Sequence, residues 1–190
     1  MSLANKANLS LSLPTNRPYI RASTSAARTM RIGILSDTHG YLDPRLLPAF
    51  EDVDAIIHAG DIGGQHILDA LSAIAPVHAV YGNNDEKRDT LGLPLRTDVD
   101  LAGVRFHLVH QLPHAAPAPG THAVVFGHSH RTLIEERGGV LYLNPGAAGR
   151  AGFHRIQTVA ILEITRAKIT EARILDLGPR EPREPRARTK

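Results

Sequence analysis

The sequence contains no cysteine, few aromatic residues and no long apolar run. Without cysteine the chain can form neither disulfides nor thiolate metal sites, so His, Asp, Glu and Asn side chains are the available metal ligands. A membrane-spanning helix needs about 20 consecutive apolar residues, and no stretch approaches that length. We therefore expect no membrane span.

Positive charge is scarce in the central part of the chain. The net charge of +3 arises at the ends, because residues 30–177 carry 13 Lys and Arg against 17 Asp and Glu. Residues 1–29 carry 4 basic residues and no acid, and residues 178–190 carry 5 basic residues against 2 Glu. A basic face is therefore not predicted, and no stable nucleic-acid complex is expected.

A length of 190 residues and a hydrophobic content of 42% are typical of one globular domain, which we place at 30–177. Residues 1–29 lack periodicity and are predicted to be a disordered extension, although an organelle transit peptide has a similar composition. Residues 178–190 are predicted to be a disordered basic tail, because they are rich in Pro and Arg. The expected location is the cytoplasm, with import through residues 1–29 left open.

Apolar patterns predict strands at 31–36, 54–61 and 77–85, a helix at 66–74, and a helix that begins with Asp43 as N-cap and Pro44 as first residue. After residue 95 the pattern indicates hairpins at 102–103 and 138–139, a strand within 122–130, and closing strands around Ile161 and Ile174. Parallel strand–helix units followed by hairpins predict an α/β fold, a four-layer-like α/β/β/α sandwich of two packed mixed sheets flanked by helices.

Polar residues follow five of these strands, in a pattern that packing alone does not explain. They are Asp37, His39, Asp61, Asn83, Asp85, His110, His128 and His130. Ligand sites in α/β sheets lie beyond the carboxyl ends of strands. A bound cation would offset the cost of desolvating the carboxylates and would bind neutral imidazoles. With Asp85 assigned to bracing its loop, seven groups remain, more than the four that one zinc takes, so two divalent metals are expected.

These residues resemble the motifs of the calcineurin-like metallophosphoesterases, most closely the small phosphodiesterases of the YfcE type. The motifs are SDTHG at 36–40, GD at 60–61, GNND at 82–85, His110, GHSH at 127–130 and NPGA at 144–147. The resemblance implies the metallophosphoesterase fold and two metal sites that share Asp61. One site would consist of Asp37, His39, Asp61 and His130, and the other of Asp61, Asn83, His110 and His128.

The resemblance further implies a dinuclear metal-dependent phosphodiesterase, in which a hydroxide bridging the metals attacks phosphorus in line with the leaving oxygen. Asp61, Asn83 and Asn84 are the expected catalytic residues. The metals are expected among Mn, Fe, Ni, Zn and Mg, with Mn favoured. Asn84 stands where many relatives have a His that protonates the leaving group, and an amide cannot do this. Gln111 stands where the family usually has Gly, and its side chain is expected to crowd the substrate or alter the backbone.

Two other functions on the same fold remain open. One is a non-catalytic protein-interaction scaffold, like the retromer subunit that resembles these enzymes, and the other is a phosphomonoesterase. A scaffold does not need a complete ligand set, and a monoesterase needs a cluster of basic residues that the sequence does not show. Relatives often associate, so a homo-oligomer is compatible with the sequence. The remaining histidines, including His58 and His154, are expected to be structural.

Overall fold

The computed structural model describes residues 28–86 and 91–180. The expected N-terminal extension and the basic tail therefore lie outside the described residues, except for 28–29 and 178–180. Within the described part, no helix is long and apolar enough to span a membrane.

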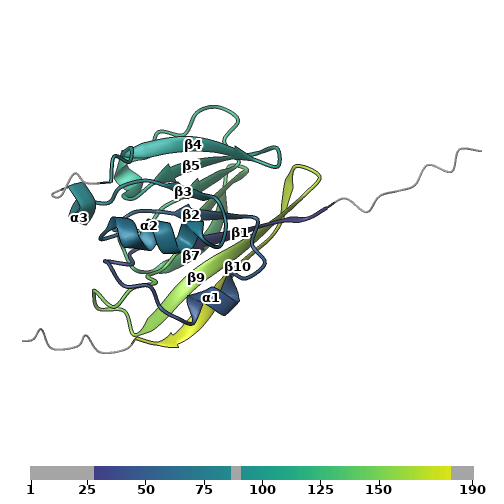
Figure 1. Ribbon diagram of the computed structural model, residues 1–190. Helices are drawn as coiled ribbons and strands as arrows, with labels where there is room; N and C mark the ends of the chain where they lie inside the picture. The colour runs from purple at the N-terminus through teal and green to yellow at the C-terminus, as the bar shows by residue number, and fades with distance from the viewer. Residues whose placement is uncertain (1–27, 87–90, 181–190) are drawn as a thin grey trace, which may run out of the picture.

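The first sheet, sheet A, contains five strands (Figure 1). Their spatial order is β10 (Lys168–Pro179), β9 (Ile156–Thr165), β1 (Met30–Leu35), β2 (Ala55–His58) and β3 (Val77–Ala79). The strands β1, β2 and β3 run parallel, whereas β9 is antiparallel to both β1 and β10. The carboxyl ends of three consecutive parallel strands therefore lie at one edge of sheet A.

The second sheet, sheet B, also contains five strands, in the order β4 (Arg96–Leu101), β5 (Val104–Val109), β6 (Ala123–Val125), β8 (Val140–Pro145) and β7 (Thr132–Arg137). The three central strands are parallel, and β4 and β7 are antiparallel to their neighbours. Two-residue turns at 102–103 and 138–139 close the outer hairpins, and all four turn residues have positive φ, as tight hairpin turns require. Both predicted hairpins are confirmed.

The main core lies between the two sheets. Successive side chains of β2 point to opposite faces of sheet A. Ile57 belongs to this core, whereas Ile56 packs on the opposite face. Phe106 and Leu108 of β5 are fully buried in the same core. Full burial of a side chain of this size stabilises the fold by about 1.5–3 kcal/mol.

Helices cover the outer face of sheet A. The short helix α1 (Leu46–Ala49) and the helix α2 (Gln65–Ser72) lie over this face (Figure 1) and contribute to a second apolar cluster. In α2 the residues Ile67, Leu68 and Leu71 are buried at helical spacing. The outer face of sheet B is covered more thinly, since Phe126 and Val124 pack against Leu112 of the 3-10 helix η1 (Leu112–His114). The predicted two-sheet α/β sandwich is confirmed.

Several element boundaries differ from the expectation. The strand expected at 54–61 is shorter, because β2 ends at His58 and residues 59–61 belong to the loop that carries Asp61. The strand expected at 77–85 ends at Ala79, because the chain turns into the single helical turn α3 (Asn83–Glu86). Helix α1 begins at Leu46, since the Asp43 carboxylate accepts the Arg45 backbone N–H at 2.9 Å and holds the preceding residues in a turn. Strand β10 continues to Pro179, although the tail was expected to begin at residue 178.

Candidate metal centre

The loops after four parallel strands meet at one edge of the sandwich. Asp37 and His39 follow β1, Asp61 follows β2, His110 follows β5, and the segment 127–130 follows β6. Backbone hydrogen bonds join neighbouring loops within each sheet. The Asp37 N–H donates to the Gly60 carbonyl at 3.0 Å, and the Gly127 N–H donates to the His110 carbonyl at 3.0 Å. Residues as far apart in the sequence as Asp37 and His128, which are separated by 91 positions, therefore contribute to one cluster.

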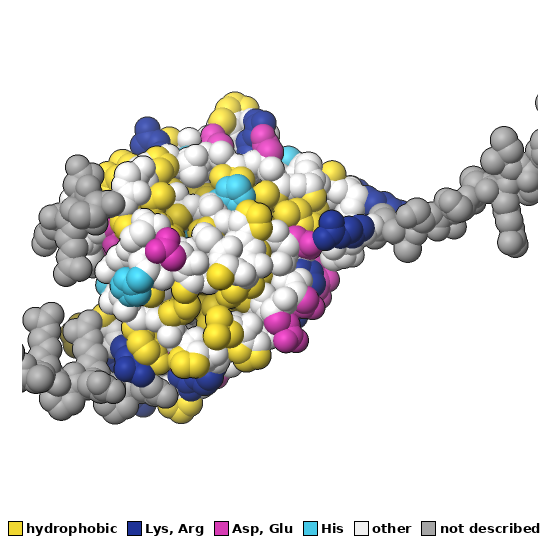
Figure 2. All heavy atoms as spheres, in the orientation of Figure 1, with side chains coloured by type: hydrophobic (Ala, Val, Ile, Leu, Met, Phe, Trp, Pro, Cys, Tyr) yellow, Lys and Arg dark blue, Asp and Glu magenta, His cyan; other side chains and the backbone are white. Residues whose placement is uncertain are grey.

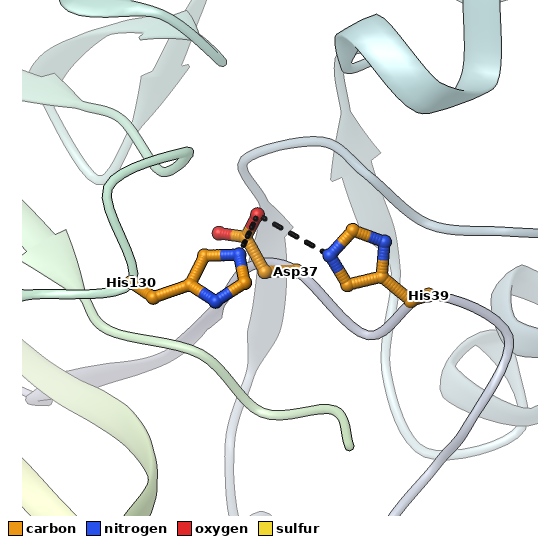
Figure 3. A group of neighbouring side chains, drawn as sticks. All are labelled: Asp37, His39 and His130. Atoms are coloured by element: carbon orange, nitrogen blue, oxygen red, sulfur yellow. Dashed lines mark ion pairs between the residues drawn. The ribbon is translucent and has the colours of Figure 1, made fainter. Parts of the chain in front are cut away.

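The first group of candidate ligands consists of Asp37, His39 and His130. Figure 3 shows the Asp37 carboxylate between the two imidazoles, which come from different loops. Asp37 Oδ1 lies 3.1 Å from His130 Nε2 and 3.8 Å from His39 Nε2. The two imidazole centroids are 5.6 Å apart, which leaves space for a cation between three donor atoms.

The second group consists of Asp37, Asp61 and His110, all of them buried. Asp61 Oδ2 lies 3.5 Å from His110 Nε2 and 3.8 Å from His39 Nε2, so Asp61 spans the two groups. Asp37 is shared as well, because its Oδ1 atom lies 4.0 Å from His110 Nε2. Two carboxylates thus lie between imidazoles that belong to different groups.

The polar atoms at the centre of this cluster have no hydrogen-bond partner. Asp37 Oδ1, His39 Nε2 and His110 Nε2 are all buried and unpaired. Leaving a buried polar group unpaired costs about 1–3 kcal/mol, and most such atoms in proteins are paired. The His110 ring is fixed from behind, since Nδ1 contacts the Ala59 carbonyl at 2.7 Å and must donate its proton there. Nε2 then faces the carboxylates and is the nitrogen available to a cation, so this donor set fits divalent cations.

The backbone of the cluster is strained at the candidate ligands themselves. Eight described non-glycine residues have positive φ. Five of these are the candidate ligands Asp37, His39, Asp61, His128 and His130. Asp and His adopt this conformation more readily than bulky or β-branched residues, but strain of this kind usually collects at functional sites. The fold therefore holds the backbone of these residues in an unfavourable conformation that directs their side chains into the cluster.

Glycines let the loops approach the carboxylates closely. A Cβ atom added at Gly127 would overlap the Ser36 hydroxyl and crowd Asp37 Oδ2. A Cβ atom at Gly82 would overlap Asp61 Oδ1. These two glycines belong to the GHSH and GNND motifs, so part of each motif serves to bring backbone against a carboxylate.

Burial and charge shift the pKa values of three cluster residues. Burial lowers the pKa of His39, and the carboxylates of Asp61 and Asp37 oppose this only in part. Burial alone would raise the pKa of Asp61, but His110 and the donors of Asn84 together hold it far below its usual range. Burial would lower the pKa of His110, and Asp61 and Asp37 raise it above its usual value. A cation that binds His110 must therefore compete with a proton.

Three predicted site residues lie beside the two groups. Asn83 Oδ1 accepts a hydrogen bond from the Gln111 side chain at 3.0 Å, so Gln111 holds a candidate ligand. Asn84 donates its backbone N–H to Asp61 Oδ1 at 2.9 Å and its side-chain amide to Asp61 Oδ2. His128 is exposed, and its ring centroid lies 5.3 Å from that of His110.

Asp85 braces two loops, as expected. Its carboxylate accepts backbone N–H groups from Ile62 at 2.9 Å, Gly63 at 2.8 Å and Gly82 at 2.9 Å. His58 is structural as well, since Nδ1 accepts the Gly60 N–H at 3.2 Å and Nε2 lies 2.9 Å from the Thr38 hydroxyl. Both residues fix the loops that carry Asp61 and Asp37.

The loop between β8 and β9 contributes residues that the sequence analysis did not assign to the site. A cavity of about 470 Å³ opens beside the cluster. It is lined by His128, Ser129, His130, Arg131, Gly152, Phe153 and His154. Phe153 is fully exposed, and His154 lies against His130. Gly152, Phe153 and His154 follow the NPGA motif closely but belong to none of the motifs, so no spacing pattern connects them with the ligands.

Two mixed sheets with carboxylates and imidazoles gathered at their strand ends define a metal-binding α/β sandwich. The calcineurin-like phosphoesterase superfamily domain matches residues 30–167, so the chain belongs to this family. A probable metallophosphoesterase of Methanocaldococcus jannaschii is 33% identical over 135 residues, which cover 63% of this chain and 68% of the relative. A phosphodiesterase of the same organism is 30% identical over 165 residues, which cover 75% of this chain and 98% of the relative.

A solved structure has the same fold at low sequence identity. Wild-type Vps29 of Entamoeba histolytica, crystallised in complex with zinc, superposes with a TM-score of 0.64 at 20% identity. The match covers 78% of this chain and the whole of Vps29. At this identity the likeness supports the fold and not the activity.

Proposed function

We propose that this protein is a metal-dependent phosphodiesterase with two divalent cations. Asp37, His39, Asp61 and His130 would hold one cation, and Asp61, Asn83, His110 and His128 would hold the other. The observation that carries the proposal is the set of three buried, unpaired ligand atoms, Asp37 Oδ1, His39 Nε2 and His110 Nε2. The identity to a phosphodiesterase over nearly its whole length supports the same reaction class.

In this proposal some residues would bind the cations, and Asn84 would orient one of the ligands. Paired cations, when bound, neutralise the charge of a phosphoryl group and lower the pKa of a bound water. Asp61 faces imidazoles of both groups, and the two donors of Asn84 fix its carboxylate in that orientation. Asn84 carries no titratable proton, so the side chain next to Asp61 cannot protonate a leaving group.

The charge around the cavity favours a diester over a monoester. Arg131 is the cavity's single Lys or Arg among the described residues, whereas a dianionic monoester would favour several cations. On the face over α1 and α2, Lys and Arg side chains lie at separate positions near the rim (Figure 2). Among the residues that the structure describes, this arrangement offers no continuous basic patch on that face for a long polyanion. Mn is the favoured metal, because the carboxylate and amide oxygens of the ligand set suit it.

A hydrolysis assay tests the proposal. The purified chain is stripped of metal with a chelator and assayed with bis(p-nitrophenyl) phosphate and with p-nitrophenyl phosphate, before and after addition of Mn, Mg, Zn, Ni or Fe. We expect metal-dependent hydrolysis of the diester that exceeds hydrolysis of the monoester. Asp37→Asn should abolish this activity, whereas Asp100→Asn, an exposed carboxylate on β4, should not change it.

Two results would redirect the proposal. Greater activity on the monoester would favour the phosphomonoesterase alternative. A chain that binds metal, as shown by elemental analysis, but hydrolyses neither substrate with any metal would contradict the enzyme and favour the interaction scaffold.

A further inference from the structure

His154 lies directly behind one candidate metal ligand. It belongs to the loop between β8 and β9, and its Nδ1 atom lies 3.3 Å from Nδ1 of His130. The two ring centroids are 5.2 Å apart with an interplanar angle of 69°. On its other side, His154 Nε2 lies 3.0 Å from the carbonyl oxygen of Gly149. A chain of contacts thus runs from Gly149 through His154 to His130.

The hydrogen-bonding capacities of these groups determine where the protons lie. A carbonyl oxygen can only accept, so His154 must carry its proton on Nε2 and donate it to Gly149. A neutral imidazole has one N–H, so His154 Nδ1 is an acceptor. The contact between the two Nδ1 atoms then requires His130 to donate from its own Nδ1. His130 Nε2 is left with a lone pair.

That lone pair points into the cluster. His130 Nε2 lies 3.1 Å from Asp37 Oδ1, and Asp37 Oδ1 has no hydrogen-bond partner. The short contact between Asp37 and His130 is therefore not a hydrogen bond. Two lone-pair atoms at this distance are the arrangement that a shared cation would stabilise.

The other side of the cluster has the same arrangement with a different acceptor. His110 donates from Nδ1 to the Ala59 carbonyl and directs its Nε2 toward Asp61. For His110 the backbone supplies the acceptor, whereas for His130 a side chain supplies it. Gly152 leaves room for this contact, because a Cβ atom there would overlap the His130 ring.

We propose that His154 is a positioning residue of the metal centre, which holds His130 in the tautomer and orientation that present Nε2 to a cation. The inference rests on the metal site of the proposed function. Loss of an outer hydrogen-bond partner of a metal-binding His typically weakens metal affinity by about 10–100-fold. The structure therefore assigns a role at the centre to a histidine that the sequence motifs do not include.

Two variants with opposite expectations test this role. His154→Phe keeps a ring of similar size but removes the acceptor, and should weaken binding of Mn by about 10–100-fold in calorimetric titrations. His154→Asn places an amide oxygen near the position of the imidazole Nδ1, and should restore affinity to within a few-fold of wild type. His114→Phe, on the exposed helix η1, is the matched control and should bind Mn like the wild type.

A second measurement does not depend on bound metal or on activity. Side-chain ¹⁵N spectra of the metal-free chain report which nitrogen of His130 carries the proton. We expect the Nδ1–H form in the wild type and in His154→Asn, and loss of that preference in His154→Phe. Thermal unfolding of each variant verifies that it is folded, and if His154→Phe does not fold, Gly152→Ala separates the two rings by another route.

The outcomes distinguish this inference from the proposed function. Unchanged Mn affinity and an unchanged His130 tautomer in His154→Phe would overturn the role of His154. A wild type that binds Mn without hydrolysing any phosphoester would contradict the enzyme while leaving both readouts for His154 intact. A wild type that binds no metal, even with the expected tautomer, would overturn both.

Discussion

At the scale of single residues, Asn84 is held against the carboxylate that spans both ligand groups. Its backbone and side-chain N–H groups both donate to Asp61, which fixes the side chain where many relatives have a histidine. An amide has no proton to give near neutral pH, and help from a general acid contributes about 10²–10⁴ in rate. The chemistry of the leaving group should therefore limit the rate of the proposed hydrolysis.

We predict that hydrolysis rates fall steeply as the phenol of an aryl phosphodiester becomes more basic. Asn84→His should flatten this dependence, because an imidazole can protonate the leaving oxygen. The measurement is a plot of log(kcat/KM) against phenol pKa for a series of substituted aryl diesters. A flat plot for the wild type would show that another group donates the proton.

His58 makes stability depend on pH. Its ring is fully buried between Thr38 and Gly60, and desolvation lowers its pKa from 6.5 to about 4. The unfolded chain therefore binds a proton at a higher pH than the folded chain does. The contribution of neutral His58 to the free energy of unfolding is fully present above pH 6.5. It is lost as the pH falls toward 4, and the loss amounts to about 3 kcal/mol.

His58→Gln removes this titration and isolates its contribution. Between pH 7 and pH 4 the wild type should lose about 3 kcal/mol more of its free energy of unfolding than the variant does. Urea unfolding of the metal-free proteins at several pH values measures it. A constant difference across this range would contradict a neutral, buried His58.

At the scale of elements, the short helix α3 matters more for its hydrogen bonds than for its length. Asp85 on α3 accepts three backbone N–H groups, two from the loop after β2 and one from Gly82. These bonds hold the loop that contains Asp61 against the segment that contains Asn83. Removing the carboxylate would leave three donors without a partner, at about 1–3 kcal/mol for each one that stays buried.

We predict that Asp85→Ala lowers the free energy of unfolding by at least about 3 kcal/mol and weakens Mn binding as well. Glu86→Ala is the matched control, because Glu86 is the exposed neighbour on the same helical turn. Chemical denaturation and metal titration of both variants measure the two effects. Equal stability of the two variants would show that Asp85 does not brace these loops.

At the scale of the whole molecule, the cluster lies where the two sheets meet. Sheet A supplies Asp37, His39 and Asp61, and sheet B supplies His110 and His130. A cation bound by both sets would link the sheets in the folded state alone. At a free metal concentration of 100 Kd this linkage adds about 2.7 kcal/mol for one site.

Asp37→Asn should separate the stability of the metal-free protein from its capacity to bind metal. The amide can donate to a bare histidine nitrogen, so the metal-free variant should be as stable as the metal-free wild type, or about 1 kcal/mol more stable. Saturating Mn should raise the melting temperature of the wild type by more than that of the variant, which keeps only the ligands of the second site. If Mn raised the melting temperature of the variant as much as that of the wild type, Asp37 would not be a metal ligand.

Much of the fold was predictable from local patterns. The apolar alternation of the strands and the turn pairs at 102–103 and 138–139 predicted the strands and hairpins, because side-chain period and turn geometry act over a few residues. The strand expected at 77–85 was too long. Its polar end forms α3 because Asp85 finds its partners in the loop at 62–63, about 20 residues earlier in the chain.

The sequence by itself determined which ligands were available and in what order. A chain without cysteine, with Asp, Asn and His after successive strands, specifies oxygen and imidazole donors for a divalent cation. Only the tertiary structure decided how these donors are held: Asn84 on Asp61, Gln111 on Asn83, and His154 behind His130. The physical reason is that the direction of a lone pair depends on hydrogen-bond partners that folding brings close from distant parts of the chain.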